Sequence, residues 1–398
     1  MRGMIRRLVA ALALLAPLPA LAAPPPATVV VAFGRDSITP LIVEGQANKQ
    51  TGRALEANDP VRIASISKLI MALTALRLMD EGKVDLTRDI SDYLGWKLRS
   101  PYHPDVAITL SHLLSHRAGL SDKAGYIIPL GESLEAKLGD PAAWRDTGPP
   151  GDAAFEYANL GSPLVATALE AASGERYDRL VERLVFAPLA VKACLNWIGC
   201  GPDMEARVVT LYRDTGEVAR DAPEDLPPAC TIPVAEGQPC DLASYVPGTN
   251  ASIFSPQGGV RIGMMDLARI GQALLRMERN GFLSDKAAEL WIYALIGSAN
   301  DDASGAAAAG FCGYGLGAYG LLASDPCKDD LFHDGRERLG HGGEAYGLRS
   351  GLWFSIADDQ GFAYFTTEVP PPSGEVETAA ADPRETELMA RALEMVRE

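Results

Sequence analysis

Basic residues are scarce in this chain relative to acidic ones. Its 398 residues include 36 Lys and Arg against 52 Asp and Glu, a formal net charge of −16. Proteins that bind nucleic acid need a basic face to neutralise phosphates, so this balance argues against a nucleic-acid partner. Hydrophobic residues make up 47% and charged residues 22%, which is ordinary for a globular protein and excludes a disordered or collagen-like chain.

Patterns typical of metal centres, nucleotide sites and membrane spans are also missing. There is no C-x-x-C pair and no histidine at zinc-finger spacing from a cysteine pair, so we expect no metal. His112 and His116 lack the glutamate of an H-E-x-x-H site, which favours structural roles. The G-x-G-x-x-G string at 315–320 follows no Rossmann-like unit, so we expect no cofactor. No apolar stretch after residue 22 is long enough to cross a bilayer.

The first 22 residues have the pattern of an export signal. Three arginines among the first seven residues precede an apolar run over 8–15, and Ala20-Leu21-Ala22 provides an A-x-A cleavage pattern. Pro17 and Pro19 interrupt the stretch, which is short for an uncleaved anchor. We therefore predict a cleaved signal peptide over 1–22 and a periplasmic or secreted mature chain, with the Sec and twin-arginine routes both open.

Six cysteines, all in the second half of the chain, agree with an oxidising destination. They fall into three close pairs, and we predict disulfides between neighbours while other connectivities stay open. The predicted pairs are Cys194–Cys200, Cys230–Cys240 and Cys312–Cys327.

Predicted strands lie near both ends of the chain, with helices between them. Alternating and β-branched segments predict strands at 28–33, 40–44, 313–321, 345–355 and 361–368. Because strands so far apart must pair to make one sheet, we expect an α+β fold with an inserted helical region. A Cys- and Pro-rich loop insert is expected at about 192–256, and a C-terminal helix within 374–398 should pack on the sheet.

Apolar residues at helical spacing predict the helices. They are expected at about Ser65 to Met79, at Ser111 to His116 with a cap at Gly119, over 161–186 with a break at Gly174, and at Asp266 to Arg276.

The first chemical motif is Ser65-Ile66-Ser67-Lys68 at the start of the apolar helix. A serine in a first helical turn lies near unpaired backbone N–H groups and the positive end of the dipole, both of which stabilise an oxyanion. Lys68 lies on the same helix face and can act as a base when burial lowers its pKa. A short motif of this kind is also typical of an ordinary helix cap.

Two further motifs lie downstream. Tyr157 in Tyr157-Ala158-Asn159 can relay a proton, and Asn159 can hydrogen-bond both Lys68 and a substrate carbonyl. Gly340-His341-Gly342-Gly343-Glu344 precedes a predicted strand, where glycines would let a substrate approach the backbone closely. A turn into the last hairpin is the alternative for this segment.

In this order the three motifs resemble those of the penicillin-recognising serine hydrolases, which include class C β-lactamases, serine D-Ala-D-Ala carboxypeptidases and β-lactamase-like esterases. The likeness spans about residues 28–368. Further matching segments are Ile63–Lys68, Ile108–Leu120, Phe155–Gly161, Pro188-Leu189 and Gly258-Gly259 with Asp266-Leu267-Ala268. The resemblance implies a β-lactamase/transpeptidase-like fold, with the site between an antiparallel sheet and a mostly helical lobe.

The resemblance also implies roles for individual residues. Ser65 would be acylated, with Lys68 and Tyr157 sharing the proton. The oxyanion would bind the backbone N–H groups of Ser65 and Glu344. The predicted substrate-binding residues are Asn159, His341, Gly342, Gly343 and Glu344.

Two departures affect the predicted substrate. His341 replaces the lysine of the third motif, and Glu344 adds negative charge, so efficient β-lactamase activity is not expected. Arg349 could replace the lost cation, but an exposed strand arginine is the favoured interpretation. The sequence favours a carboxypeptidase-like amidase acting on a small acyl or D-amino-acid peptide substrate. The alternatives are an esterase, a class C-like β-lactamase and a non-catalytic binding relative, and the oligomeric state is left open.

Overall fold

The structure is a computed structural model that describes residues 24–222, 230–299, 311, 313–322, 331–371 and 381–397. The predicted signal peptide, Cys312 and Cys327 lie outside the described residues.

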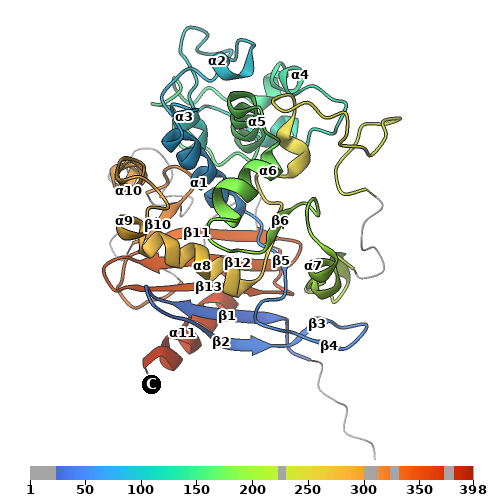
Figure 1. Cartoon of the computed structure of the whole chain (residues 1–398), viewed down its shortest axis with the longest axis vertical. Coiled ribbons are helices and arrows are strands. Elements are labelled where there is room, and N and C mark those ends of the chain that lie inside the picture. Colours follow the sequence, from blue (N-terminus) through green and yellow to red (C-terminus); the bar gives the residue numbers. More distant parts are fainter. Residues whose placement is uncertain are drawn as a thin grey trace, which may run out of the picture.

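A six-stranded antiparallel sheet joins the two ends of the chain (Figure 1). Strand β1 pairs with β2 on one side and with β13 on the other, so that Thr28 lies opposite Thr366 and Phe33 opposite Gly361. The predicted pairing of distant strands is therefore confirmed. In sheet order the strands are β10 (Tyr319–Leu321), β11 (Arg338–Ala345), β12 (Leu348–Ser355), β13 (Gln360–Thr366), β1 (Thr28–Phe33) and β2 (Ile38–Glu44).

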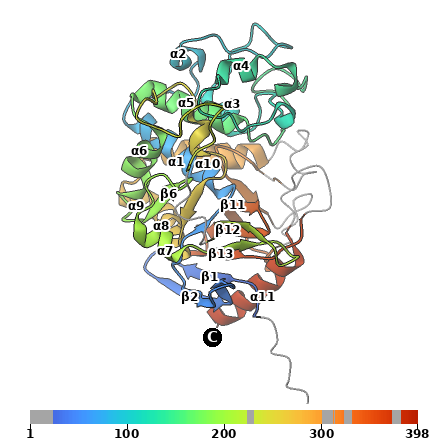
Figure 2. The same cartoon turned by 90° about the vertical axis from the view of Figure 1, so that its right-hand side faces the viewer.

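Helices cover both faces of this sheet, which explains the nearly continuous apolar sequence of β1. Val29 and Val31 face the main core, which includes α8 (Met264–Leu275). Val30 faces a second cluster with Leu388 and Met389 of α11 (Pro383–Arg397). Figure 2 shows α8 and α11 on opposite sides of the strands. Within the segment 374–398 where a C-terminal helix was expected, α11 packs against the sheet.

The helical lobe lies beyond α1 (Ile66–Asp80), which is buried almost along its whole length. Figure 1 shows α2 to α5 at the end of the molecule away from β2. The helices of this lobe are α2 (Ser91–Leu94), α3 (Leu110–Leu114), α4 (Leu134–Leu138), α5 (Gly161–Ser173) and α6 (Tyr177–Val181). The remaining helices are α7 (Pro202–Arg207), α9 (Met277–Asn280) and α10 (Asp285–Ala299). Within the described ranges, every helix is too short or too polar to cross a bilayer.

Three small antiparallel sheets complete the fold. The three-stranded one, in the order β5-β9-β6, leads directly into α1. Its strands are β5 (Val61–Arg62), β9 (Val260–Ile262) and β6 (Ala193–Leu195). The two hairpins are β3 (Gln46–Asn48) with β4 (Arg53–Ala54), and β7 (Leu211–Tyr212) with β8 (Val218–Arg220).

Several expected boundaries were wrong. The segment from Gly340 to Glu344 lies within strand β11 instead of preceding a strand, and the turn falls at Tyr346-Gly347. Helix α3 ends at Leu114, because His116 already has a positive φ of 55°. Within 192–256, where a loop insert was expected, the chain also forms β6, α7 and the hairpin of β7 with β8.

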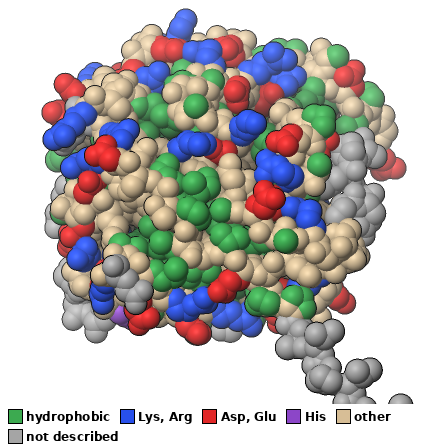
Figure 3. Space-filling model, turned by 60° about the horizontal axis from the view of Figure 1, so that its bottom comes forward, with side chains coloured by type: hydrophobic (Ala, Val, Ile, Leu, Met, Phe, Trp, Pro, Cys, Tyr) green, Lys and Arg blue, Asp and Glu red, His purple; other side chains and the backbone are tan. Residues whose placement is uncertain are grey.

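The surface carries charges of both signs close together. In Figure 3, on the face seen from below Figure 1, Lys and Arg side chains alternate with Asp and Glu around a hydrophobic area. Exposed apolar residues near this end of the fold include Val43 of β2 and Met395 of α11.

Candidate active site

Ser65 lies at a sharp turn between β5 and α1. The preceding residue, Ala64, has φ 47°, a left-handed conformation that is strained for a residue with a Cβ. Ser65 then caps α1, with its carbonyl accepting a hydrogen bond from the Lys68 N–H at 2.9 Å. The turn therefore places the hydroxyl at the helix N-terminus, as the sequence predicted.

The Lys68 ammonium contacts the Ser65 hydroxyl from within the core. Lys68 is 1% exposed, and its Nζ lies 3.1 Å from Ser65 Oγ. It also donates to Asn159 Oδ1 at 2.7 Å and to the Gln257 carbonyl at 3.2 Å. All three of these acceptors are neutral oxygens, and they hold the amine beside the alcohol.

Asn159 is oriented by a residue that sequence reasoning missed. The Asp122 Oδ2 atom accepts from Asn159 Nδ2 at 3.0 Å and from its backbone N–H at 2.9 Å, while Asp122 Oδ1 accepts from the Leu160 N–H. Because a carboxylate only accepts and an ammonium only donates, Asp122 and Lys68 together fix which end of the amide faces Lys68. Asp122 follows Ser121 in a short 3₁₀ turn, a context with no sequence signal for this role.

Aromatic rings hold Tyr157 beside Lys68. The Lys68 Nζ lies 4.6 Å from the centroid of the Tyr157 ring. The ring stacks on Phe311 at 4.7 Å and packs against His116 at 4.5 Å. Tyr157 and Ser65 line the same pocket, so the first two motifs meet as predicted.

Strand β11 brings the third motif against the turn that carries Ser65. A Cβ on Gly343 would lie only 2.4 Å from the Ile63 carbonyl oxygen, so only glycine lets this strand approach so closely. His341, Gly342, Gly343 and Glu344 line the pocket with Ser65. Their roles toward a substrate remain predictions.

A buried chain of hydrogen bonds links the second and third motifs. His116 Nδ1 accepts from the Ala158 N–H at 3.1 Å, so in the neutral ring Nε2 carries the proton and donates it to Tyr314 Oη at 3.2 Å. The Tyr314 hydroxyl then donates to His341 Nε2 at 3.1 Å, and His341 Nδ1 donates to the Gly342 carbonyl. Each group has one consistent role, which fixes both tautomers.

The imidazoles of His116 and His341, which belong to this series of hydrogen bonds, both stay neutral. Burial, followed by the nearby Lys68 charge, lowers the pKa of His341 to about 3. The same two causes lower the pKa of His116 well below its ordinary value. His341 therefore does not supply the positive charge that a lysine would supply in the third motif. Sequence reasoning missed Tyr314 and treated His116 only as a structural residue.

Arg349 is not the exposed strand arginine that the sequence favoured. Its side chain is 12% exposed and lines the pocket. Its Nη2 lies 2.8 Å from Glu344 Oε2, and its Nε lies 3.8 Å from Glu385 Oε2. Two carboxylates thus flank this cation: β11 places Glu344 opposite Arg349, and α11 brings Glu385.

Two of the three predicted disulfides lie within the described residues, and both are confirmed. Cys194 bonds to Cys200 with Cα atoms 5.2 Å apart, and Cys230 bonds to Cys240 with Cα atoms 5.8 Å apart. The described part of the chain holds no group of three or more His, Cys, Asp or Glu residues arranged to bind a metal ion.

Comparison with known proteins gives a family match across most of the chain. The Beta-lactamase family model matches residues 25–384. One relative is the D-alanyl-D-alanine-carboxypeptidase/endopeptidase AmpH of Escherichia coli K12, 32% identical over 33% of this chain and 35% of the relative. Another is the esterase EstB of Burkholderia gladioli, 24% identical over 49% of this chain and 51% of the relative. The matches thus span between a third and half of these relatives.

Solved structures show the same fold at low identity. A class C beta lactamase from Rhodobacter sphaeroides superposes with a TM-score of 0.60 at 15% identity, covering 94% of both chains. A D-stereospecific amidohydrolase from Streptomyces sp. gives a TM-score of 0.58 at 19% identity, covering 85% of this chain and 88% of the other. The predicted α+β, β-lactamase-like fold is therefore confirmed.

Proposed function

The chain belongs to the Beta-lactamase family, and from that premise we propose that it is an exported serine hydrolase that forms an acyl-enzyme on Ser65. Its favoured substrate is an amide bond in a peptide containing D-amino acids, as in a D-Ala-D-Ala carboxypeptidase. The observation that carries the proposal is the position of Lys68 Nζ, between Ser65 Oγ at 3.1 Å and Asn159 Oδ1 at 2.7 Å.

The chemistry follows from these contacts. Ser65 Oγ attacks the carbonyl carbon and transfers its proton to the Lys68–Tyr157 pair, which delivers it to the leaving nitrogen as the C–N bond breaks. Water then hydrolyses the ester on Ser65, and the proton returns to Oγ. The backbone N–H groups of Ser65 and Glu344 would bind the oxyanion in both steps.

The substrate class is supported by the names of relatives. AmpH is named as a carboxypeptidase and endopeptidase for D-alanyl-D-alanine, and one structural neighbour is named as a D-stereospecific amidohydrolase. Export is supported by the signal pattern over 1–22 and by the two disulfides. The predicted cellular location is the periplasm or the medium.

An esterase is the second candidate, and the third motif favours it. His341 is neutral and Arg349 is flanked by Glu344 and Glu385. The pocket therefore offers no unpaired cation from these residues to the carboxylate of a terminal D-alanine or a β-lactam. An ester with an uncharged leaving group would not need one.

A substrate panel separates the candidates. Purified protein without residues 1–22 and its Ser65→Ala variant are each assayed with p-nitrophenyl acyl esters, nitrocefin and a tripeptide ending in D-Ala-D-Ala. Release of D-alanine by the native protein alone supports the carboxypeptidase, and ester turnover without peptide release supports the esterase. A fluorophosphonate should add mass at Ser65, and equal rates in the two proteins would end the catalytic hypothesis.

A further inference from the structure

A second cavity, of about 470 Å³, lies beside the catalytic residues. Gln257 connects the two, because its carbonyl accepts a hydrogen bond from Lys68 Nζ while the residue also lines the cavity. Arg62, three residues before Ser65, lines the cavity as well. Pockets for small organic molecules occupy roughly 300–1,000 Å³, so this cavity has the size for part of a substrate.

The charges that line this cavity are mostly positive. Among the described residues there are three guanidinium groups and one carboxylate: Arg62, Arg220, Arg261 and Asp221. A local excess of positive charge stands out in a chain whose net charge is −16.

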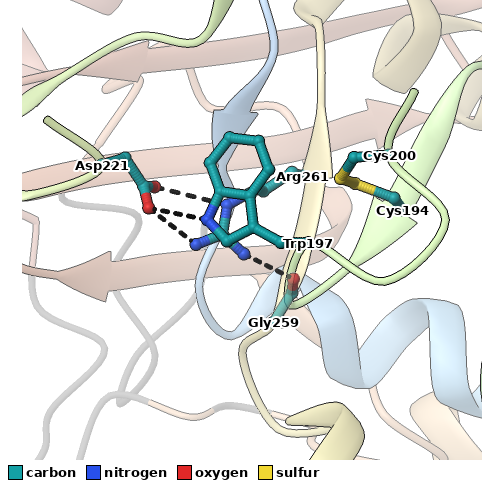
Figure 4. The surroundings of a disulfide bond; sticks show 6 residues. All are labelled: Cys194, Trp197, Cys200, Asp221, Gly259 and Arg261. Atoms are coloured by element: carbon teal, nitrogen blue, oxygen red, sulfur yellow. Dashed lines mark hydrogen bonds and ion pairs between the residues drawn. A yellow bond between two sulfur atoms is a disulfide. The ribbon is translucent and has the colours of Figure 1, made fainter. Parts of the chain in front are cut away.

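The single carboxylate is already engaged. Asp221 Oδ1 lies 2.8 Å from Arg261 Nη2 and accepts from Trp197 Nε1 at 3.1 Å, and all three side chains are buried. Figure 4 shows the Trp197 indole over the Arg261 guanidinium, next to the Cys194–Cys200 disulfide. Asp221 and Arg261 therefore neutralise each other, and the positive charges that remain are Arg62 and Arg220.

Arg62 is buried without a partner for two of its nitrogens. The residue is 6% exposed, and among the described residues Nε and Nη1 have no hydrogen-bond acceptor and no carboxylate lies within ion-pair distance. Other deeply buried arginines of this chain do have one, such as Arg261 with Asp221 and Arg338 with Asp334. A buried guanidinium is costly unless it is paired, and within the described part of the chain this site lacks its counter-ion.

The surroundings of Arg62 are suited to an organic anion. The Tyr346 ring centroid lies 5.4 Å from the Arg62 guanidinium and 5.3 Å from that of Arg220. Tyr346 occupies the turn after strand β11, so both cations lie close to the third catalytic motif. Burial and the neighbouring Arg261 lower the pKa of Arg62 to about 10, which leaves it cationic at neutral pH.

We propose that this cavity binds a carboxylate group of the substrate, with Arg62 as the buried anchor and Arg220 beside it. The planar fork of a guanidinium matches a carboxylate in a bidentate hydrogen bond. The inference rests on the proposed function, since it names a feature of the molecule that Ser65 attacks. The carboxylate can belong to the acyl portion or to the leaving portion, and the two arms of the test distinguish these sources.

The first arm varies the acyl portion. Mono-p-nitrophenyl esters of adipate, pimelate and suberate are each compared with the same ester whose distal carboxylate is methylated. The second arm varies the leaving portion, with a D-Ala-D-Ala tripeptide whose C-terminus is free or amidated. We expect kcat/KM to favour the free carboxylate by about 10- to 100-fold in one arm. In Arg62→Met that ratio should fall to about 1.

Matched variants make the result specific. Arg88→Met removes an exposed arginine of the helical lobe and should leave the ratio unchanged, whereas Arg62→Lys should retain part of it. Replacement of an unpaired buried charge by Met should not lower the melting temperature. If Arg62→Met does not fold, the same ratio of kcat/KM values, for the free over the blocked carboxylate, is measured in Arg62→Lys and Arg220→Met, where it should be lower than in the native protein. No preference in either arm, or a preference unchanged in these variants, would overturn the inference. Fluorophosphonate labelling of Ser65 tests the proposed function separately.

Discussion

Tyr314→Phe is the sharpest test of the buried hydrogen-bond chain that links the second and third sequence motifs. The substitution removes one hydroxyl and keeps the ring, which packs against Phe155, Phe311 and Tyr319. That hydroxyl accepts from His116 Nε2 at 3.2 Å and donates to His341 Nε2 at 3.1 Å. Both imidazoles then lose a partner at once.

The cost can be estimated from burial. His341 is 1% and His116 is 7% exposed, so water cannot readily replace the missing hydroxyl. A buried polar group left without its hydrogen bond costs about 1–3 kcal/mol. Two such groups predict a loss of about 2–6 kcal/mol in the free energy of unfolding.

Urea denaturation of the purified chain without residues 1–22, at pH 8, measures this loss. The control is Tyr293→Phe, which removes a hydroxyl from a side chain on α10 that is mostly exposed and should change stability by less than about 0.5 kcal/mol. A Tyr314→Phe variant as stable as this control would refute the hydrogen-bond chain. Because His341 and Gly342 line the pocket, kcat should also fall more than KM changes.

Three further predictions concern other parts of the fold. Asp122→Asn should lower kcat by about 10²-fold with little change in KM, because it frees the Asn159 amide that contacts Lys68. Steady-state kinetics measures both constants. A fall in kcat that is explained by a lower folded fraction in urea denaturation would contradict a positioning role. Burial raises the pKa of Glu170 from 4.5 to about 7, so its contribution to stability is present below pH 4.5 and is lost as the pH rises toward 7. The free energy of unfolding of Glu170→Gln, measured relative to that of the native chain, should therefore rise by about 2 kcal/mol between pH 5 and pH 8. Denaturation curves at several pH values measure it, and a difference between the two proteins that does not change with pH would disprove the assignment. Cys194→Ser with Cys200→Ser should lower the free energy of unfolding by about 2 kcal/mol, as expected for a short closed loop, and an unchanged midpoint would contradict this.

Most of the architecture could be predicted, because helices and strands follow from local residue patterns and the pairing of strands follows from their order along the chain. The pattern of β1 and the apolar spacing of α1 both depend on nearby residues, and the pairing of distant strands follows from their positions. The boundaries that failed depend on tertiary contacts. Gly342 and Gly343 suggested a turn, yet they lie in a strand because they pair with Gly351 and Ser350 of β12, and the Ile63 carbonyl lies close to Gly343.

In the candidate site, too, residues with a local sequence signal could be predicted and residues that depend on tertiary contacts could not. Ser65, Lys68, Tyr157 and Asn159 belong to short motifs with a chemical rationale, and the structure brings them together. Residues that act through a distant partner carried no such signal. Asp122 is 37 positions from the amide it orients.

The pairing of β1 with β13 also constrains how the molecule can be made. While the ribosome has yet to reach residue 360, the edge of β1 that β13 will cover has no complementary strand. Exposed strand edges promote association between chains. Synthesis therefore leaves a long interval in which this edge of the early β1–β2 hairpin is uncovered. A circular permutant that joins β13 directly to β1 would shorten that interval.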